Sequence, residues 1–398
     1  MSGMEMEMET NQSMPFGRPL YVMAKPAGPA CNMTCRYCYY LDKNKTATDG
    51  PGPTVMSDDM LERFIKMYIE SQTTPDVLFC WHGGEALLRP RGFYEKAMTL
   101  QQRYAGGRHI DNSIQTNGTL LDDDWCRFFR DNGWLVGVSV DGPREIHDAM
   151  RRTRGGAPTF DTVMAGIRLL QKYSVEWNAM AVVNSLNAGR PLEFYRFFRS
   201  IGARYLQFTP IVERRLPDGT LAAPGHGAGA VLTDESVSPA AWGEFLCRVF
   251  DEWYAHDIGQ MFVQLFESTL ARWTGLEPGM CSMAPECGHA LVMEHNGDVY
   301  SCDHFVFPEY RLGNIRHQTL VEMMLSDRQQ TFGAAKRDSL PARCRECRWL
   351  FACNGECPKN RFAVTPGGER GLNYLCEGYR RYFSHVDPYM RQLREMFG

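Results

Sequence analysis

The chain has 398 residues, a formal net charge of -4 and a pI near 6.2, and 44% of its residues are hydrophobic. Such a chain is long enough for one large and one smaller domain with buried cores, and its acidic balance argues against a nucleic-acid partner. No apolar run approaches the roughly 20 residues of a membrane span, so no membrane partner is expected.

The first residues alternate Met with Glu and show no basic and then apolar secretion signal. We predict that residues 1–16 form a disordered tail and that the protein is cytoplasmic. The chain has 14 cysteines, which are reduced in that compartment, so their clustering points to metal binding before disulfides.

Residues 17–238 are predicted to form the larger domain. Short β-rich runs alternate there with helix-length amphipathic segments, as in repeated βα units around a parallel sheet. The six units are fewer than a closed barrel needs, so we predict an α/β fold with a partial (β/α)6 TIM-like barrel and its chemistry in the loops after the strands. The predicted strands are Leu20–Ala24, Val77–His82, Asn112–Gln115, Leu135–Val140, Trp177–Val183 and Tyr205–Pro210.

A second, cysteine-rich domain is predicted after a helical bridge. The apolar periodicity of Pro239–His256 and Met261–Trp273 predicts two helices within residues 239–277. Residues 278–380 carry eight cysteines, and residues 381–398 are predicted to form a C-terminal helix. Within the cysteine-rich region, Ala290 to Tyr300 is typical of a β-hairpin closed by an Asn-Gly turn.

Three cysteines follow the first predicted strand in a single loop: Cys31, Cys35 and Cys38. Three thiolates can hold a four-iron cluster and leave one iron open to another ligand. A zinc site completed by a distant cysteine or histidine is the alternative. The spacing and the position after the first strand resemble the signature of the radical S-adenosylmethionine superfamily, in which the amino and carboxylate groups of S-adenosylmethionine bind the open iron.

The resemblance extends to the ends of later strands. Gly83, Gly84 and Glu85 resemble the element that binds the amino group of S-adenosylmethionine, although a tight turn with a capping glutamate would have the same sequence. The resemblance also implies that Ser139 and Arg151 hold the ribose and carboxylate, while Tyr37 and Leu206 pack near the adenine. Ordinary caps and turns are the alternative for each of these residues taken alone.

The eight cysteines of the second domain make two complete sets of four thiolates. Two structural zinc ribbons are the alternative, which Cys344 and Cys347 would fit. The arrangement resembles the SPASM domain, which binds two auxiliary [4Fe-4S] clusters. By that resemblance one set is Cys281, Cys287, Cys302 and Cys357, and the other is Cys344, Cys347, Cys353 and Cys376.

Within that superfamily the chain is most similar to the anaerobic sulfatase-maturating enzymes, through residues 81–85, 115–118, 139–143 and 302–304. The resemblance implies an enzyme with three [4Fe-4S] clusters that oxidises a Cys or Ser side chain of a sulfatase to Cα-formylglycine. Hydrogen abstraction from Cβ by the 5′-deoxyadenosyl radical would begin the reaction. Asp303 would be the base that takes the substrate proton, unless it only accepts hydrogen bonds in a turn.

The expected partners are an unfolded or nascent sulfatase polypeptide and an electron donor such as a flavodoxin or ferredoxin. Two other functions remain open. A related SPASM-type enzyme could form a thioether or side-chain crosslink, although the short segment before Pro19 is expected to leave no room for the peptide-recognition domain that such enzymes often carry. A non-catalytic iron–sulfur electron carrier would have no need of an open iron or of the Gly-Gly-Glu element.

Overall fold

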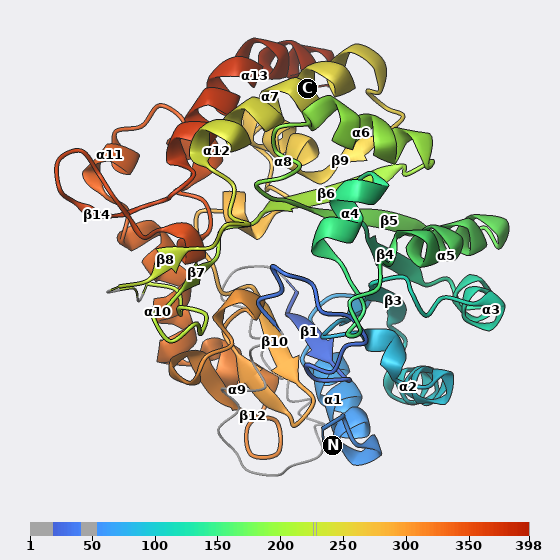
Figure 1. Ribbon diagram of the computed structural model, residues 1–398. Helices are drawn as coiled ribbons and strands as arrows, with labels where there is room; N and C mark the ends of the chain where they lie inside the picture. Colours follow the sequence, from blue (N-terminus) through green and yellow to red (C-terminus); the bar gives the residue numbers. More distant parts are fainter. Residues whose placement is uncertain (1–18, 41–53, 226, 228, 398) are drawn as a thin grey trace.

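The structure is a computed structural model that describes residues 19–40, 54–225, 227 and 229–397. The predicted tail, residues 1–16, lies outside the described residues. A ten-stranded sheet in the order β12-β11-β10-β1-β2-β3-β4-β5-β6-β9 forms an α/β partial barrel (Figure 1). Its six central strands confirm the predicted ones: β1 (Tyr21–Lys25), β2 (Asp76–Trp81), β3 (His109–Thr116), β4 (Leu135–Ser139), β5 (Trp177–Val183) and β6 (Tyr205–Pro210).

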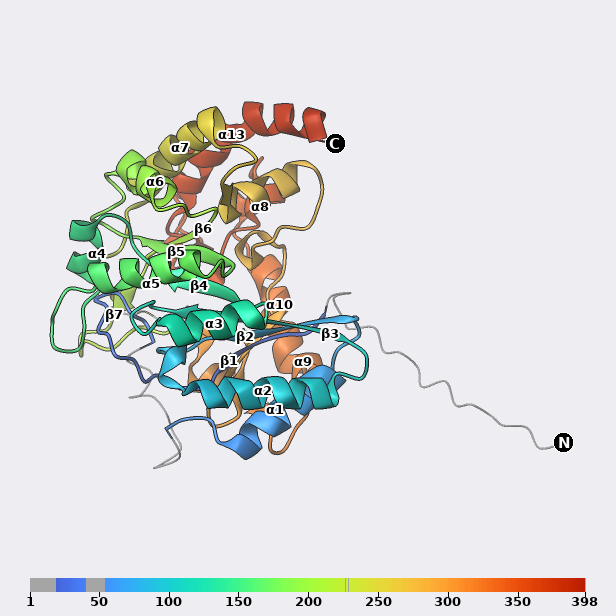
Figure 2. The same ribbon diagram turned by 90° about the vertical axis from the view of Figure 1, so that its right-hand side faces the viewer.

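Helices that connect consecutive parallel strands lie on the outside of the sheet (Figure 2). In the first of them the Ser57 hydroxyl caps the helix by accepting from the Met60 amide at 3.2 Å, and Asp58 and Asp59 lie in the positive first turn. Its apolar face is buried against the sheet. These helices are α1 (Asp58–Glu70), α2 (Arg91–Tyr104), α3 (Asp123–Asp131), α4 (Arg144–Met150), α5 (Phe160–Lys172) and α6 (Pro191–Ser200).

The predicted bridge helices are present, with one correction. Helix α7 spans Pro239–His256 as predicted, but α8 begins at Gln264, because Phe262–Val263 is a short strand, β9, that pairs with β6. The C-terminal helix α13 (Cys376–Phe397) begins before the predicted residue 381. A local turn precedes it, in which the Asn373 side-chain oxygen accepts from the Leu375 amide at 2.8 Å.

The hairpin of the cysteine-rich region is part of the barrel sheet. Strand β10 (Ala290–Glu294) pairs in parallel with β1 over five residues, from Tyr21 with Ala290 to Lys25 with Glu294. Strands β11 (Asp298–Tyr300) and β12 (Arg311–Asn314) continue the sheet in antiparallel fashion. The carboxyl ends of β1 and β10 therefore lie side by side.

No helix among the described residues is long and apolar enough to cross a membrane.

Short elements complete the fold. The two-stranded sheets are β7 (Arg214–Arg215) with β8 (Val231–Leu232), and β13 (Ala363–Val364) with β14 (Arg370–Leu372). The remaining helices are α9 (Leu320–Leu325), α10 (Asp327–Asp338), α11 (Ala342–Arg345) and α12 (Leu350–Cys353), and the short 3-10 turns are η2 (Ala86–Leu88), η3 (Cys281–Met283), η4 (Asp303–Phe305), η5 (Pro308–Tyr310) and η6 (Pro358–Asn360).

Helices α7 and α13 contact each other through their backbones. A Cβ atom added at Gly378 of α13 would lie 2.4 Å from the Pro239 carbonyl oxygen, and one at Gly243 of α7 would lie 2.9 Å from the Gly378 Cα. The bridge and the C-terminal helix therefore depend on glycine at both positions.

Gly378→Ala should lower the free energy of unfolding by about 1–3 kcal/mol, the usual cost of forcing atoms into a packed contact. Gly92→Ala is the matched control, because an added Cβ on this exposed residue of α2 meets only the Glu95 carboxylate, at 4.0 Å. Denaturation followed by circular dichroism compares the two variants. Equal midpoints would contradict the close contact of α7 with α13.

Candidate active site and cysteine sets

The three-cysteine loop follows β1 and is hydrogen-bonded to the end of α4 and the residues directly after it. The Thr34 amide donates to the Arg152 carbonyl at 2.8 Å, and the Arg36 amide to the Met150 carbonyl at 3.0 Å. The pKa of the Cys35 thiol is raised to about 12, chiefly by burial; Arg151 opposes the shift, and the loop neighbours Cys38 and Cys31 contribute to it, so the three thiols lie close together. Such buried thiols need a cation to become thiolates, which bound iron would supply.

Gly83 and Gly84 lie against this loop. The Gly84 amide donates to the Gly28 carbonyl at 2.9 Å, and a Cβ at Gly84 would lie 2.1 Å from the Ala30 carbonyl oxygen. Gly83 has a φ of +130°, which side chains rarely adopt. Both glycines therefore let the end of β2 approach the backbone that leads into the cysteine loop.

Glu85 is fully buried and caps the short helix η2. A capping glutamate was the alternative to a role in binding S-adenosylmethionine. Its carboxylate accepts from the Leu87 amide at 2.8 Å, the Thr116 hydroxyl at 2.8 Å and the Asn117 amide at 2.7 Å. The Asn117 side chain in turn donates to Asn32, inside the cysteine loop, at 2.8 Å. Glu85 thus fixes the end of β3 next to the loop.

A second buried group joins Arg151, Tyr37 and Asp141. Arg151 Nη1 donates to the Tyr37 hydroxyl at 2.7 Å, and that hydroxyl donates to Asp141 Oδ2 at 2.5 Å. Among the described residues, Arg151 Nε has no hydrogen-bond partner, although it is buried. An unsatisfied guanidinium beside Cys31 and Cys35 suits a carboxylate ligand such as that of S-adenosylmethionine.

Ser139 ends β4, where its hydroxyl accepts from Gln115 at 2.9 Å. Leu206 of β6, in contrast, does not lie at the end of its strand. Phe208 packs its ring on Phe245 of α7 at 5.6 Å, and Leu206, two residues earlier in β6, shares that face of the sheet. The structure therefore turns Leu206 toward the outer helices and does not bring it to the cofactor loops.

Asp303 begins η4, directly after Cys302, and lies beside the end of β1. Lys25 Nζ forms an ion pair with Asp303 Oδ1, and the Tyr39 hydroxyl donates to Asp303 Oδ2. The Lys25 side chain is 1% exposed. Because Tyr39 follows Cys38, these contacts connect the proposed base directly to the cysteine loop.

The sequence analysis did not identify Lys25, Tyr40 and Glu294. Lys25 Nζ lies 3.7 Å from the centre of the Tyr40 ring, and the Tyr40 hydroxyl donates to Glu294 Oε2 at 2.5 Å. Lys25 and Glu294 are register partners at the ends of β1 and β10. A charged residue at the end of an otherwise apolar buried strand was the signal available for Lys25.

His82 directly follows β2 and lies close enough to Lys25 and Asp303 for their charges to shift its pKa. The pKa of His82 is lowered to about 4, chiefly by burial; Asp303 opposes the shift and Lys25 contributes to it. The imidazole is therefore neutral near pH 7, and its Nδ1 accepts from the Gly83 amide at 2.8 Å. His82 adds no positive charge near Asp303.

The structure gathers the eight remaining cysteines into two sets. Burial raises the pKa of the Cys357 thiol well above its usual value, and Cys287, Cys302 and Cys281 raise it further. The pKa of Cys353 is raised to about 12 by burial, with smaller contributions from Cys376 and Cys344. Cys347 in turn interacts with Cys344.

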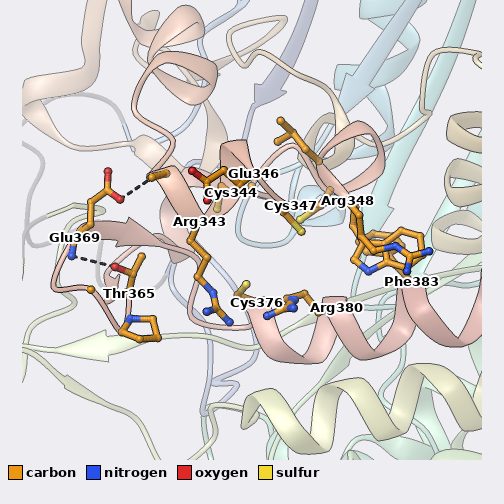
Figure 3. A pocket seen from close by; sticks show the side chains of 17 residues that line it. Arg343, Cys344, Glu346, Cys347, Arg348, Thr365, Glu369, Cys376, Arg380 and Phe383 are labelled. Atoms are coloured by element: carbon orange, nitrogen blue, oxygen red, sulfur yellow. Dashed lines mark hydrogen bonds between the residues drawn. The ribbon is translucent and has the colours of Figure 1, made fainter.

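The second set lines an open cavity of about 660 Å³. Cys344, Cys347 and Cys376 project into it from α11, the turn after α11 and the start of α13 (Figure 3). Among the described residues, no three His, Cys, Asp or Glu side chains meet at one point as ligands of a single metal ion do. Cys353 of α12 also lines this cavity, so the four thiols of the second set border one space.

Comparisons with known proteins agree with this geometry. Residues 26–198 match the radical SAM superfamily, and residues 285–348 match SPASM, an iron-sulfur cluster-binding domain. The chain is 61% identical to a serine-type anaerobic sulfatase-maturating enzyme of Bacteroides thetaiotaomicron, over 96% of this chain and 93% of that protein. It is 31% identical to a cysteine-type anaerobic sulfatase-maturating enzyme of Clostridium perfringens, over 93% of this chain and 97% of that one.

Solved structures show the same relationship. Native anSMEcpe with bound AdoMet matches with a TM-score of 0.83 at 30% identity, covering 95% of this chain and 100% of that one. The same protein is also known with bound AdoMet and the Cp18Cys peptide. A non-catalytic electron carrier is excluded, because the relatives are enzymes. The chain belongs to the anaerobic sulfatase-maturating enzymes, a family of radical S-adenosylmethionine oxidoreductases with an iron–sulfur SPASM domain.

Proposed function

We propose that this enzyme oxidises a seryl side chain of a sulfatase polypeptide to Cα-formylglycine. The observation that carries the proposal is the position of Asp303, which is held by Lys25 and Tyr39 at the edge of the three-cysteine loop. A proton acceptor and a radical source must both reach one substrate carbon and its oxygen, and the proximity of Asp303 to the three-cysteine loop supports such a reaction.

The cluster ligands in this proposal are the three cysteine sets. Cys31, Cys35 and Cys38 hold the [4Fe-4S] cluster of the barrel, and the two sets of four hold the auxiliary [4Fe-4S] clusters. The S-adenosylmethionine site is formed by Gly83, Gly84, Ser139, Arg151 and Tyr37. Glu85 positions the loops of this site through its hydrogen bonds. When bound, the barrel cluster and S-adenosylmethionine supply the 5′-deoxyadenosyl radical that takes a hydrogen atom from the substrate Cβ.

Asp303 completes the oxidation in this mechanism. The seryl carbon that has lost a hydrogen atom must still lose the hydroxyl proton and one electron to become an aldehyde. Asp303 accepts the proton, while Lys25 and Tyr39 hold its carboxylate in one orientation. Cys302, the residue before Asp303, would be a ligand of the first auxiliary cluster, which would supply an electron acceptor close to the base.

The partners follow from this chemistry. The substrate is an unfolded or nascent sulfatase chain, and the electron that starts each cleavage comes from a low-potential carrier such as a flavodoxin or ferredoxin. We place the enzyme in the cytoplasm, whose reducing conditions preserve thiolate ligands. Serine is proposed as the target because the relative of 61% identity is serine-type and the cysteine-type relative is 31% identical.

Reconstituted enzyme, incubated without oxygen with sulfatase peptides that differ only in Ser or Cys, should convert the Ser peptide efficiently. Mass spectrometry would show the loss of two hydrogens, and a hydrazide reagent would label the new aldehyde. Because a crosslink also loses two hydrogens, a product of that mass without hydrazide labelling would favour the crosslinking alternative. Turnover of the Cys peptide alone would contradict the serine assignment.

Asp303→Asn should lower the rate of aldehyde formation by about 10²- to 10⁴-fold, the usual contribution of a general base. Its iron content and its reductive cleavage of S-adenosylmethionine should stay near the wild-type values, because neither needs the proton acceptor. The two assays are run on the same preparation. Wild-type aldehyde formation by this variant would remove Asp303 from the mechanism.

Lys25→Met should lower aldehyde formation by about a hundredfold, because the Asp303 carboxylate loses the ion pair that orients its Oδ1. Lys66→Met is the matched control, since Lys66 is 54% exposed and lies 3.9 Å from Glu70 on the surface of α1. Rates are compared at equal iron content. A Lys25 variant as active as the Lys66 variant would show that Lys25 does not position the base.

A further inference from the structure

Two buried cations, Lys336 and Arg361, lie near the cysteines of the second domain. Neither has a role in the proposed reaction. Lys336 of α10 is 1% exposed, and its Nζ donates to three backbone carbonyls of the segment that carries Cys281. The acceptors are the carbonyl oxygens of Cys281 at 2.8 Å, Ser282 at 2.7 Å and Ala284 at 2.5 Å. The charge of Lys336 is thus fixed beside the first cysteine set.

Arg361 follows η6 and is 8% exposed. Its guanidinium donates only to backbone oxygens of the described residues, among them Lys336 at 2.5 Å, Asn354 at 2.7 Å and Gly355 at 2.8 Å. Burial lowers its pKa, whereas Cys287 of the first set, the Glu356 carboxylate, and Cys344 and Cys353 of the second set raise it. Arg361 therefore lies between the two sets.

Neither cation has an acidic partner within ion-pair distance among the described residues. The one buried carboxylate nearby is Glu356, 6% exposed, which accepts from Asn373 at 2.7 Å and Asn360 at 3.4 Å. Glu356 raises the pKa of Cys353 and Cys357 and so opposes the two cations. Two buried cations near a single carboxylate leave an excess of positive charge, which is unstable in a protein interior, so these positions suit further anionic groups nearby.

We propose that Lys336 and Arg361 are the charges that compensate the two auxiliary clusters and raise their reduction potentials. This inference rests on the proposed ligation of those clusters by the two cysteine sets. An iron–sulfur core with four thiolates is anionic, and one-electron reduction adds negative charge, so a fixed cation favours the reduced form. Lys336 acts mainly on the first cluster, Arg361 acts on both, and Glu356 acts in the opposite direction.

The consequence concerns the electron that leaves the substrate. In the proposed reaction an oxidised auxiliary cluster would supply the acceptor for the substrate's second electron, while Asp303 accepts the proton. A higher reduction potential makes the cluster a better acceptor. The buried cations would thus direct the electron away from the reaction centre without touching substrate or S-adenosylmethionine.

The test uses the full-length chain with Cys31, Cys35 and Cys38 replaced by Ala, so that only the auxiliary clusters remain. Oxygen-free titration with dithionite, followed by electron paramagnetic resonance, measures their potentials. Lys336→Gln should make one of the two potentials more negative, and Arg361→Gln should make both more negative. Glu356→Gln, which keeps the shape and the acceptor oxygen, should shift potentials in the positive direction, and Lys336→Arg should match the parent chain.

The outcomes separate this inference from the ligation on which it rests. A parent chain that lacks two auxiliary clusters by iron and sulfide analysis would overturn the ligation and this inference together. Two intact clusters with potentials unchanged in the Gln variants would overturn only the role of the cations. If Lys336→Arg shifts a potential as far as Lys336→Gln does, the effect is due to packing, which also overturns the inference.

Discussion

The parallel pairing of β1 with β10 is the constraint on which the site depends. It aligns Lys25 with Glu294 at the ends of two strands that are far apart in the sequence. One strand leads into the three-cysteine loop, and the other belongs to the hairpin that delivers Cys302 and Asp303. Without this pairing, the residues proposed to generate a radical and those proposed to remove a proton and an electron would belong to separate domains.

Buried charge is distributed unevenly around this junction. Near Asp303, the Lys25 charge is matched by carboxylates and covered by the Tyr40 ring. Near the auxiliary cysteines, Lys336 and Arg361 donate to backbone oxygens and exceed the single buried carboxylate, Glu356. An excess of buried cations is expected where the missing negative charge belongs to bound groups, in this case thiolate-ligated clusters.

Local patterns made much of this predictable from the sequence. The apolar runs predicted β1 to β6, the periodicity of α7 predicted its bounds, and the spacing of Cys31, Cys35 and Cys38 indicated the loop set. Only the resemblance to the SPASM domain divided the other eight cysteines into two sets. What could not be predicted was long-range. The pairing of β1 with β10 leaves no local signal, so Lys25, Tyr40 and Glu294 were missed. The sequence shows that side chains of β6 alternate between two faces, but it does not show which face points to the outer helices. The contact of Phe208 with Phe245 of α7 settles this, and it puts Leu206 on the outer face.

The most direct test of the central claim follows a hydrogen atom. The substrate is a sulfatase peptide whose target serine is deuterated at Cβ. It is incubated without oxygen with the reconstituted enzyme, reductant and S-adenosylmethionine, and the mass of the 5′-deoxyadenosine formed is measured by mass spectrometry. The proposed mechanism predicts deuterium in the 5′-deoxyadenosine together with an aldehyde in the peptide. Aldehyde formation with unlabelled 5′-deoxyadenosine would contradict abstraction from the seryl Cβ.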